Sequence, residues 1–195
     1  VKEVQGYAIA PERMTVQQFL ERWLADDARS SRYSTHKNYA QICRDHVYPR
    51  IGKLLMTRLT KAPVQAILDA LHDLKKARNT IRNVRMCLIT ASDECEKEYP
   101  HAYAAIRATK LPKIEKTHRQ EVQSFTPEQA RTFLAAVEQH RLKALYWTAL
   151  LLGARRGELL GLRVSDLDLE SKTMRITGAA QQQKGKGMVR VPTKT

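Results

Sequence analysis

Residues 148–168 read TALLLGARRGELLGLRVSDLD, and the organisation of the C-terminal part of the chain follows from this stretch. An apolar run stops at Gly153, the residue type expected where a helix ends in the left-handed conformation. Two arginines follow directly, and a second apolar segment begins after Glu158. The sequence therefore predicts two helices joined by a turn that carries arginine.

Arg155 lies at this turn between two apolar segments, so we expect a partner to hold its charge. Glu158 is three residues further along, and residues at this spacing share one face of a helix. One interpretation is a structural ion pair that fixes the turn. The other is a functional arginine that Glu158 supports. These two residues alone leave both interpretations open.

The same stretch resembles a known motif. G-x-R-x-x-E followed by L-x-G-L-x-x-x-D-x-D is similar to the first arginine motif of tyrosine recombinases, the phage integrase family. In that family the arginine binds the scissile phosphate and the acidic residue supports it. The resemblance implies these roles for Arg155 and Glu158, whereas the neighbouring Arg156 does not fit the motif position.

The composition points to a polyanionic partner. The chain has 195 residues, enough for one or two domains, and 34 Lys and Arg against 20 Asp and Glu give a net charge of +14. Such an excess favours a polyanionic partner, and nucleic acid is the commonest one. A membrane surface fits less well, because the basic residues do not gather on one amphipathic helix. With no spanning segment and no signal peptide, we expect a cytoplasmic protein.

Cysteine and histidine patterns predict neither a metal site nor a cofactor. Cys43, Cys87 and Cys95 are odd in number and contain no C-x-x-C pair, and the six histidines are scattered. The chain also lacks a glycine-rich phosphate loop. We expect the three cysteines to be small buried hydrophobes.

A mainly α fold is predicted, with a tail at residues 1–14 and a bundle of four to five helices at 15–108. Apolar residues recur at helical spacing in four segments, and each segment follows a residue that can cap a helix. The expected caps are Thr15 (with Gln18 in a capping box), Ser34, Thr60 and Asn79. Pro49 and Gly52 are expected to end the second helix, and a short helix is expected at 101–108.

Basic and polar residues cluster on this bundle, most densely where the fourth helix begins. Free N–H groups at helix starts attract phosphate, so we expect DNA contact there. The alternative is an ordinary solvated basic face. The candidate residues are Lys37, Asn38, Arg44, Lys75, Lys76, Arg78, Asn79, Thr80, Arg82 and Arg85.

The bundle sequence also resembles the SAM-like core-binding domain of phage integrases. T-V-x-x-F-L-x-x-W-L at 15–24, S-T-x-x-x-Y at 34–39 and P-x-I-G-K-x-x-x-x-x-L-T at 49–60 match its pattern. Tyr99-Pro100 stands where the family often has Asn-Pro, which leaves the end of the domain open. The resemblance implies that this domain holds duplex DNA.

Residues 109–124 are predicted to be a basic linker, either a plain hinge or a segment that follows a phosphate backbone. Residues 125–195 are expected to be the N-terminal part of an α+β catalytic domain. Its first helix begins at Thr126-Pro127, and a helix at 142–152 should be buried because it is apolar nearly all round. Strands at 172–177 and 188–191 should form a small antiparallel hairpin, with 181–187 as their loop.

The ending P-T-K-T resembles a turn of the same family, whose lysine protonates the departing 5′ oxygen. The resemblance implies this role for Lys194. Lys184 and Lys186 are rival candidates. The alternative for all three lysines is contact with backbone phosphates, or solubility.

The resemblance implies DNA transesterification through a 3′-phosphotyrosine, without metal or nucleotide. All seven tyrosines precede Arg155, so none can be the family's nucleophile and the chain alone should be inactive. We therefore expect the front portion of a site-specific recombinase or integrase that is bacterial or phage-encoded and nucleoid-associated. This portion should be a monomer, and its full-length parent should act as a homotetramer on two duplexes. The alternative is a non-catalytic DNA-binding remnant that occupies a recombination or regulatory site, and a basic adaptor for an acidic protein is a third possibility.

Overall fold

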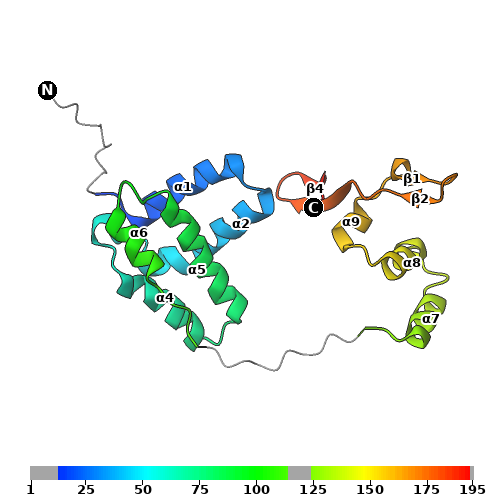
Figure 1. The fold of residues 1–195 in the computed structure, drawn as a ribbon, viewed down its shortest axis with the longest axis horizontal. Helices are drawn as coiled ribbons and strands as arrows, with labels where there is room; N and C mark the ends of the chain where they lie inside the picture. The colour runs from blue at the N-terminus through cyan, green and yellow to red at the C-terminus, as the bar shows by residue number, and fades with distance from the viewer. Residues whose placement is uncertain (1–12, 114–123, 194–195) are drawn as a thin grey trace. The chain divides into compact units, whose positions relative to one another are not determined.

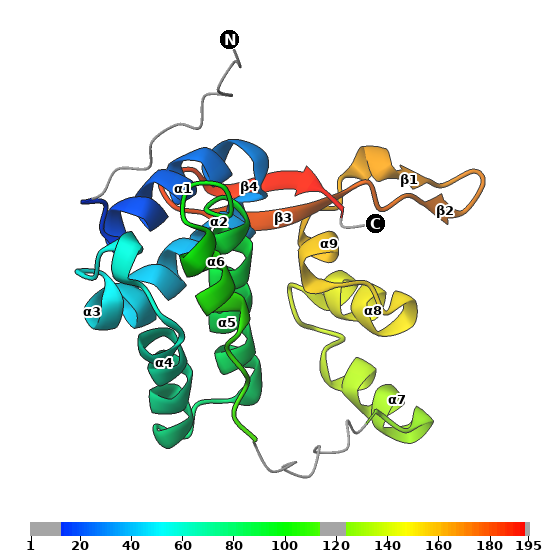
Figure 2. The same cartoon turned by 60° about the vertical axis from the view of Figure 1, so that its left-hand side comes forward.

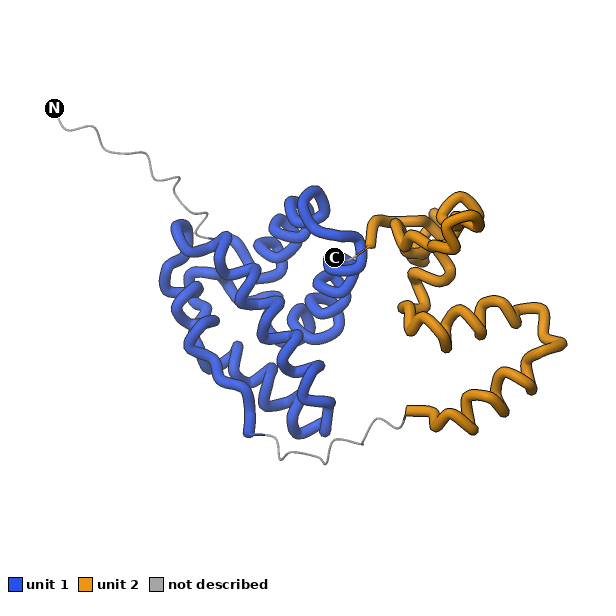
Figure 3. Tube along the Cα trace, turned by 45° about the vertical axis from the view of Figure 1, so that its right-hand side comes forward, with its two compact units in different colours: residues 1–118 blue, residues 119–195 orange. Residues whose placement is uncertain are grey.

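The structure is a computed structural model that describes residues 13–113 and 124–193. The chain divides into two compact units, residues 1–118 and residues 119–195 (Figure 3). Most of the expected tail, most of the expected linker and the candidate Lys194 lie outside the described residues.

Unit 1 is a bundle of helices around one apolar core (Figures 1 and 2). Its elements are α1 (Val16–Ser30), α2 (Tyr33–Ile42), a π-helical turn (Cys43–Val47), α3 (Tyr48–Ile51), a 3₁₀ turn (Met56–Arg58), α4 (Lys61–Asp73), α5 (Arg78–Asp93) and α6 (Pro100–Arg107). Each long helix turns its apolar face inward, and each Leu or Ile buried in this way contributes about 1.5–3 kcal/mol. The predicted mainly α bundle is confirmed.

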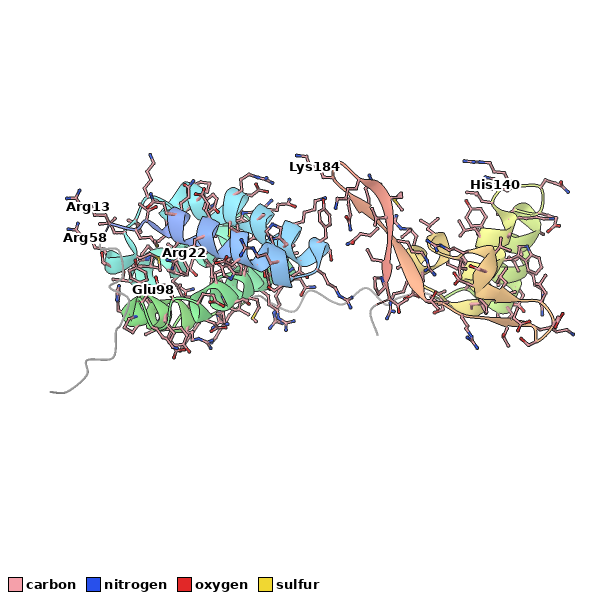
Figure 4. All side chains as sticks on the ribbon, turned by 90° about the horizontal axis from the view of Figure 1, so that it is seen from above. Arg13, Arg22, Arg58, Glu98, His140 and Lys184 are labelled. Carbon is pink, nitrogen blue, oxygen red and sulfur yellow. The ribbon has the colours of Figure 1, made fainter. Side chains whose placement is uncertain are left out.

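The start of α1 forms as its sequence predicts. The Thr15 hydroxyl accepts the backbone N–H of Gln18, and the Gln18 side chain accepts the backbone N–H of Thr15. Arg22 of α1 also pairs with Glu98 at 2.7 Å, which ties the helix to the segment before α6 (Figure 4).

The predicted starts of two other helices are wrong. α2 begins at Tyr33, before Ser34, because the carbonyl of Arg32 already accepts the backbone N–H of His36. α5 begins at Arg78, so Asn79 lies inside its first turn and Ala77 takes the cap position. Neither cap position has a side-chain hydrogen bond, and the same holds for Thr60 at the start of α4.

Pro49 does not end the second helix as expected. It falls in the first turn of α3, where proline is tolerated because the N–H it lacks would have no helical partner. The helical path therefore continues from α2 through the π-helical turn and α3, and it stops at Gly52.

Lys75 ends α4 in a left-handed conformation, with φ of 53°. The Lys76 N–H bonds to the carbonyl of Leu71 and the Lys75 N–H bonds to that of His72, the pattern of a Schellman motif. Glycine usually occupies this position, because a side chain there costs about 1–2 kcal/mol. Lysine is thus held in a strained conformation inside the basic cluster.

Replacement of Lys75 by glycine is expected to stabilise unit 1 by about 0.5–1 kcal/mol, because glycine removes the strain at the cost of a more flexible unfolded chain. Thermal unfolding should show a midpoint higher by a few degrees. Lys76→Gly is the matched control: it removes the same charge at a position without positive φ and should destabilise. An unfolding midpoint of Lys75→Gly equal to or lower than that of the wild-type chain would contradict the proposed backbone strain at Lys75.

Residues 109–111 pack with unit 1, although composition places them in the linker. The Gln65 side chain hydrogen bonds to both the N–H and the carbonyl of Lys110, at 2.8 and 2.9 Å. Arg85 donates to the carbonyl of Thr109 at 3.1 Å, and Leu111 packs against the core. These contacts fix the point at which the chain leaves the bundle.

Unit 2 begins with helices and ends with two hairpins. Its elements are α7 (Pro127–Ala136), α8 (Lys143–Leu152), α9 (Arg156–Leu160), a 3₁₀ turn (Val164–Asp166), β1 (Leu167–Asp168), β2 (Thr173–Met174), β3 (Gly178–Gln183) and β4 (Gly187–Pro192). Thr126 and Gln129 form the capping box of α7. Phe133 of α7 contacts Tyr146 of α8 edge-on, with ring centroids 5.8 Å apart.

The prediction that the apolar helix α8 is buried is wrong for the described part of the chain. Leu151 is 67% exposed, Leu152 55% and Trp147 40%. α7 and α9 are its main neighbours, and two short helices cannot cover a helix that is apolar on every side. Leu159 is the one large hydrophobe that is buried among the described residues of unit 2, and it is still 9% exposed.

The two hairpins also differ from the prediction. β1 pairs with β2, and β3 pairs with β4, so Gln181–Gln183 belong to a strand and the connecting turn is residues 184–186. β3 contains two alanines and three glutamines and lacks the apolar alternation that marks a strand in a sequence. Backbone pairing and the positive φ of Gly185 and Gly187 form the hairpin instead.

Candidate phosphate-binding and nucleic-acid site

The turn that carries Arg155 forms as the sequence predicts. α8 ends at Gly153, which has φ of 60° and ψ of 19°. No atom lies within 4 Å of the position that a side chain at Gly153 would take, so conformation and not space requires glycine. The chain then turns, and Arg155 occupies the position just before the first residue of α9.

Glu158 holds Arg155 through two hydrogen bonds. One carboxylate oxygen accepts the backbone N–H of Arg155 at 3.0 Å, and the other accepts its guanidinium Nη1 at 2.9 Å. The Glu158 side chain is only 13% exposed, whereas that of Arg155 is 76% exposed. The guanidinium therefore has a fixed direction and still has free donors that face solvent.

The electrostatics of the pair favour its ionised form. The backbone N–H of Arg155 and then its guanidinium lower the pKa of Glu158 below its usual range. Glu158 therefore remains negative at neutral pH and keeps Arg155 oriented. An arginine held in this way can present a planar fork of N–H donors to phosphate oxygens.

Close packing joins α9 to strand β3. A Cβ on Gly161 would lie 2.8 Å from the backbone nitrogen of Ala180 and 2.9 Å from the backbone of Ala179. A Cβ on Gly157, one turn earlier, would lie 3.2 Å from the Ala180 carbonyl oxygen. Glycine is required at Gly161 because helix and strand backbones meet there.

A polar network around Arg190 fastens strand β4 to the same helix. Its Nε donates to the carbonyl of Gly161 at 2.9 Å, and its Nη2 donates to Asp166 at 3.0 Å and to the Thr177 hydroxyl at 2.6 Å. The backbone N–H of Arg163 and then the Thr177 hydroxyl and Arg190 lower the pKa of Asp166. Arg190 was not identified from the sequence. The only indication of its role was the first aspartate of the D-x-D motif, Asp166, whose charge needed a cationic partner.

The candidate DNA-binding residues of unit 1 lie mostly on its surface. α2 and α5, which carry most of them, are neighbours in the bundle. Thr80 is half-buried, and Arg44 pairs with Asp45 at 3.1 Å. Those that are exposed are Lys37, Asn38, Arg44, Lys75, Lys76, Arg78, Asn79 and Arg82.

Arg85 differs from the other candidates, because the fold uses its side chain. Its Nε donates to the carbonyl of Thr109 at 3.1 Å and its Nη2 to that of Arg107 at 3.4 Å. The side chain is half-buried and joins α5 to the end of α6. Arg85 therefore has a structural role that its place in a basic cluster did not reveal.

Cysteines and possible metal ligands contribute no further site within residues 13–113 and 124–193. Cys43, Cys87 and Cys95 are free and buried, as predicted. A hydrogen bond with Cys43 and burial raise the pKa of Cys87, so this thiol stays protonated. In these ranges no group of three potential metal ligands occurs, and no helix is long and apolar enough to cross a membrane.

Two family models match the chain, one in each unit. The model for the phage integrase N-terminal SAM-like domain matches residues 15–72, and the model for the phage integrase family matches residues 123–195, which include Arg155 and Glu158. The chain belongs to the phage integrase family of tyrosine recombinases. The second match covers the whole of residues 148–168.

Two curated relatives of this chain come from bacteria. A tyrosine recombinase XerC-like protein of Caldanaerobacter subterraneus is 28% identical over 186 residues, which cover 91% of this chain and 46% of that protein. An integrase of Saccharopolyspora erythraea is 27% identical over 172 residues, 87% of this chain and 39% of that protein. The chain thus spans less than half the length of both relatives.

Solved integrase structures share the fold of this family member. The Tn1549 transposon integrase in complex with transposon right end DNA matches with a TM-score of 0.74 at 18% identity, over 93% of this chain and 58% of that one. A lambda integrase dimer bound to a COC′ core site matches with a TM-score of 0.62 at 19% identity, over 92% and 49% of the two chains. Both likenesses support the fold described above for each unit.

Proposed function

We propose that this chain takes part in site-specific DNA recombination, with unit 1 holding duplex DNA and unit 2 presenting Arg155 to the scissile phosphate. The observation that carries the proposal is the Arg155–Glu158 pair. Its guanidinium is fixed by a largely buried carboxylate and remains open to solvent, and the pair lies within the residues that the phage integrase family model matches. Because the Arg155 side chain is 76% exposed, its remaining N–H donors can reach a phosphate oxygen.

The proposed reaction is transesterification through a 3′-phosphotyrosine. Arg155 would stabilise the charge that develops on the phosphoryl oxygens, with Glu158 as its support, and Lys194 would act as general acid. None of the seven tyrosines follows Arg155 in the sequence, so we expect the 195-residue chain to bind DNA without cleaving it. Cleavage would then need a nucleophile from outside these residues, and the working assembly would be a homotetramer on two duplexes.

The covalent step can be tested with the protein encoded by the natural reading frame that contains this chain. A duplex with a nick near the cleavage point traps a phosphotyrosine intermediate, because the released strand diffuses away. Trapped protein–DNA adducts would support the recombinase. Specific DNA binding without any adduct would instead support the alternative, a non-catalytic protein that occupies a recombination or regulatory site.

The DNA-binding face of unit 1 can be tested by a matched pair of arginines on α5. Arg82→Ala is expected to weaken duplex binding and to reduce the salt slope by about 0.9, the value for one phosphate contact, without changing the unfolding free energy. Arg85→Ala should instead destabilise unit 1 by about 1 kcal/mol, since it loses hydrogen bonds to two backbone carbonyls. Binding titrations at several salt concentrations and thermal unfolding separate the two effects. Unchanged affinity in Arg82→Ala would move the interface elsewhere.

A further inference from the structure

The β3–β4 hairpin lies in the longest stretch of the chain that contains no acidic residue. Residues 171–195 contain six Lys or Arg and no Asp or Glu. Lys184 and Lys186 are exposed at the turn of this hairpin, where Figure 4 labels Lys184. The charge is complementary to a polyanion, so the hairpin fits a phosphate backbone.

The hairpin is anchored at one end and projects at the other. Ala179 and Ala180, near its base, pack on α9, and Arg190 bonds to the end of that helix. Gln181–Gly187 lie beyond these contacts. The register is continuous from Gly178↔Pro192 to Gln183↔Gly187, so the face that each side chain occupies is fixed.

One face of the projecting part carries an amide beside a thioether. Gln182 is opposite Met188 across the strands, and Arg190 is two residues along on the same face. Gln182 is exposed and Met188 is 56% exposed. No described residue hydrogen bonds to the Gln182 side chain, whereas Gln181 and Gln183 occupy the opposite face and contact each other at 3.4 Å.

We propose that the β3–β4 hairpin reads an A·T base pair in the major groove of duplex DNA through Gln182 and Met188. A two-stranded ribbon fits the major groove, and a glutamine amide can pair with adenine, accepting from N6 and donating to N7. The thymine of the same pair presents its methyl group beside these atoms, and Met188 offers an apolar contact for it. Lys184 and Lys186 would contact flanking phosphates. The inference rests on the proposed DNA-binding function and adds a source of sequence specificity to it.

Arg190 is the residue that orients this face. Its guanidinium lies over Gly178, where an added Cβ would come within 2.7 Å of it, and it bonds to Asp166 and Thr177. Because Arg190 and Gln182 share a face, the same network that joins β4 to α9 also sets the direction in which Gln182 points.

Selection of binding sites from a random duplex library tests the proposal with the 195-residue chain. Wild-type protein should select an A·T pair at one position, and Gln182→Ala should lose that preference while the other positions stay unchanged. Affinity for the selected duplex should fall about 10–100-fold in Gln182→Ala, the range for one bidentate base contact. Gln183→Ala is the matched control, because it removes the same amide from the opposite face.

A change in the DNA provides a test that leaves the protein intact. Replacing the selected thymine by uracil removes only its methyl group, so the affinity of the wild-type protein should fall. The Met188→Ala variant has already lost the contact with this methyl group, so its affinity should be the same for both duplexes. An unchanged selection profile in Gln182→Ala, or equal effects of Gln182→Ala and Gln183→Ala, would overturn the hairpin's role in base reading. Failure of the wild-type chain to bind any duplex would overturn the proposed function itself.

Discussion

Arg155→Ala is expected to lower DNA cleavage by about 10²–10³-fold in the protein that carries the nucleophile, with little change in duplex affinity. Removing one preorganised donor from a developing negative charge typically has this effect on the chemical step. Affinity should persist because the phosphate contacts proposed for unit 1 do not involve Arg155. The measurement is the rate of covalent adduct formation on a nicked duplex, together with a binding titration.

Arg156→Ala is the matched control for this prediction. Arg156 is the next residue, it is also exposed, and its removal changes the net charge equally. Glu158→Gln should give an intermediate loss, because an amide can still accept one hydrogen bond but no longer holds the guanidinium by charge. If Arg155→Ala unfolds unit 2 or collapses DNA affinity, the arginine is a structural residue that fixes the turn.

Gly161→Ala is expected to destabilise unit 2 by about 1–3 kcal/mol, enough to separate α9 from the hairpin. The added methyl group would lie 2.8–2.9 Å from backbone atoms of Ala179 and Ala180, which cannot rotate away as a side chain would. Its φ of −94° suits any residue, so the cost comes from space and not from conformation. Hydrogen exchange should show loss of protection at the β3–β4 amides.

Two other glycines of the same unit supply controls for Gly161→Ala. Gly157→Ala places a methyl group 3.2 Å from a carbonyl oxygen, and the gain in helix propensity offsets this milder crowding. Gly153→Ala meets no atom within 4 Å, but its φ of 60° adds about 1–2 kcal/mol of conformational strain. If the β3–β4 amides are protected from hydrogen exchange equally well in Gly161→Ala and in Gly157→Ala, the close contact between Gly161 and the strand β3 backbone is contradicted.

The features predicted correctly from the sequence are local in the chain. The capping box at Thr15, the left-handed stop at Gly153 and the contact between Arg155 and Glu158 all join residues three or four positions apart. Hydrogen bonds of this span depend on residue type and spacing, which can be read directly. The errors at Ser34 and Asn79 are also local, since a helix can begin without a side-chain cap once its backbone bonds start earlier.

The composition of the chain indicated a polyanionic partner. It could not distinguish a basic side chain that is available to bind this partner from one that is held by contacts within the fold. Arg82 and Arg85 look equivalent in the sequence. Arg85 contacts carbonyls 22 and 24 residues away, and that contact exists because α6 returns to α5. A basic cluster is therefore divided into binding and structural residues only when the helices pack.

By itself the sequence determined the helical segments of unit 1 and the Arg155–Glu158 pair, because side chains three or four residues apart share one face of a helix. The tertiary structure alone decided how strand β4 is tied to α9. Arg190 reaches Gly161 over 29 residues and Asp166 over 24 residues, and the backbones meet at Gly161 because it has no side chain. Contacts of such separation follow from the path of the whole chain, so no spacing pattern predicts them. The orientation of the Gln182 and Met188 face is a consequence of that path.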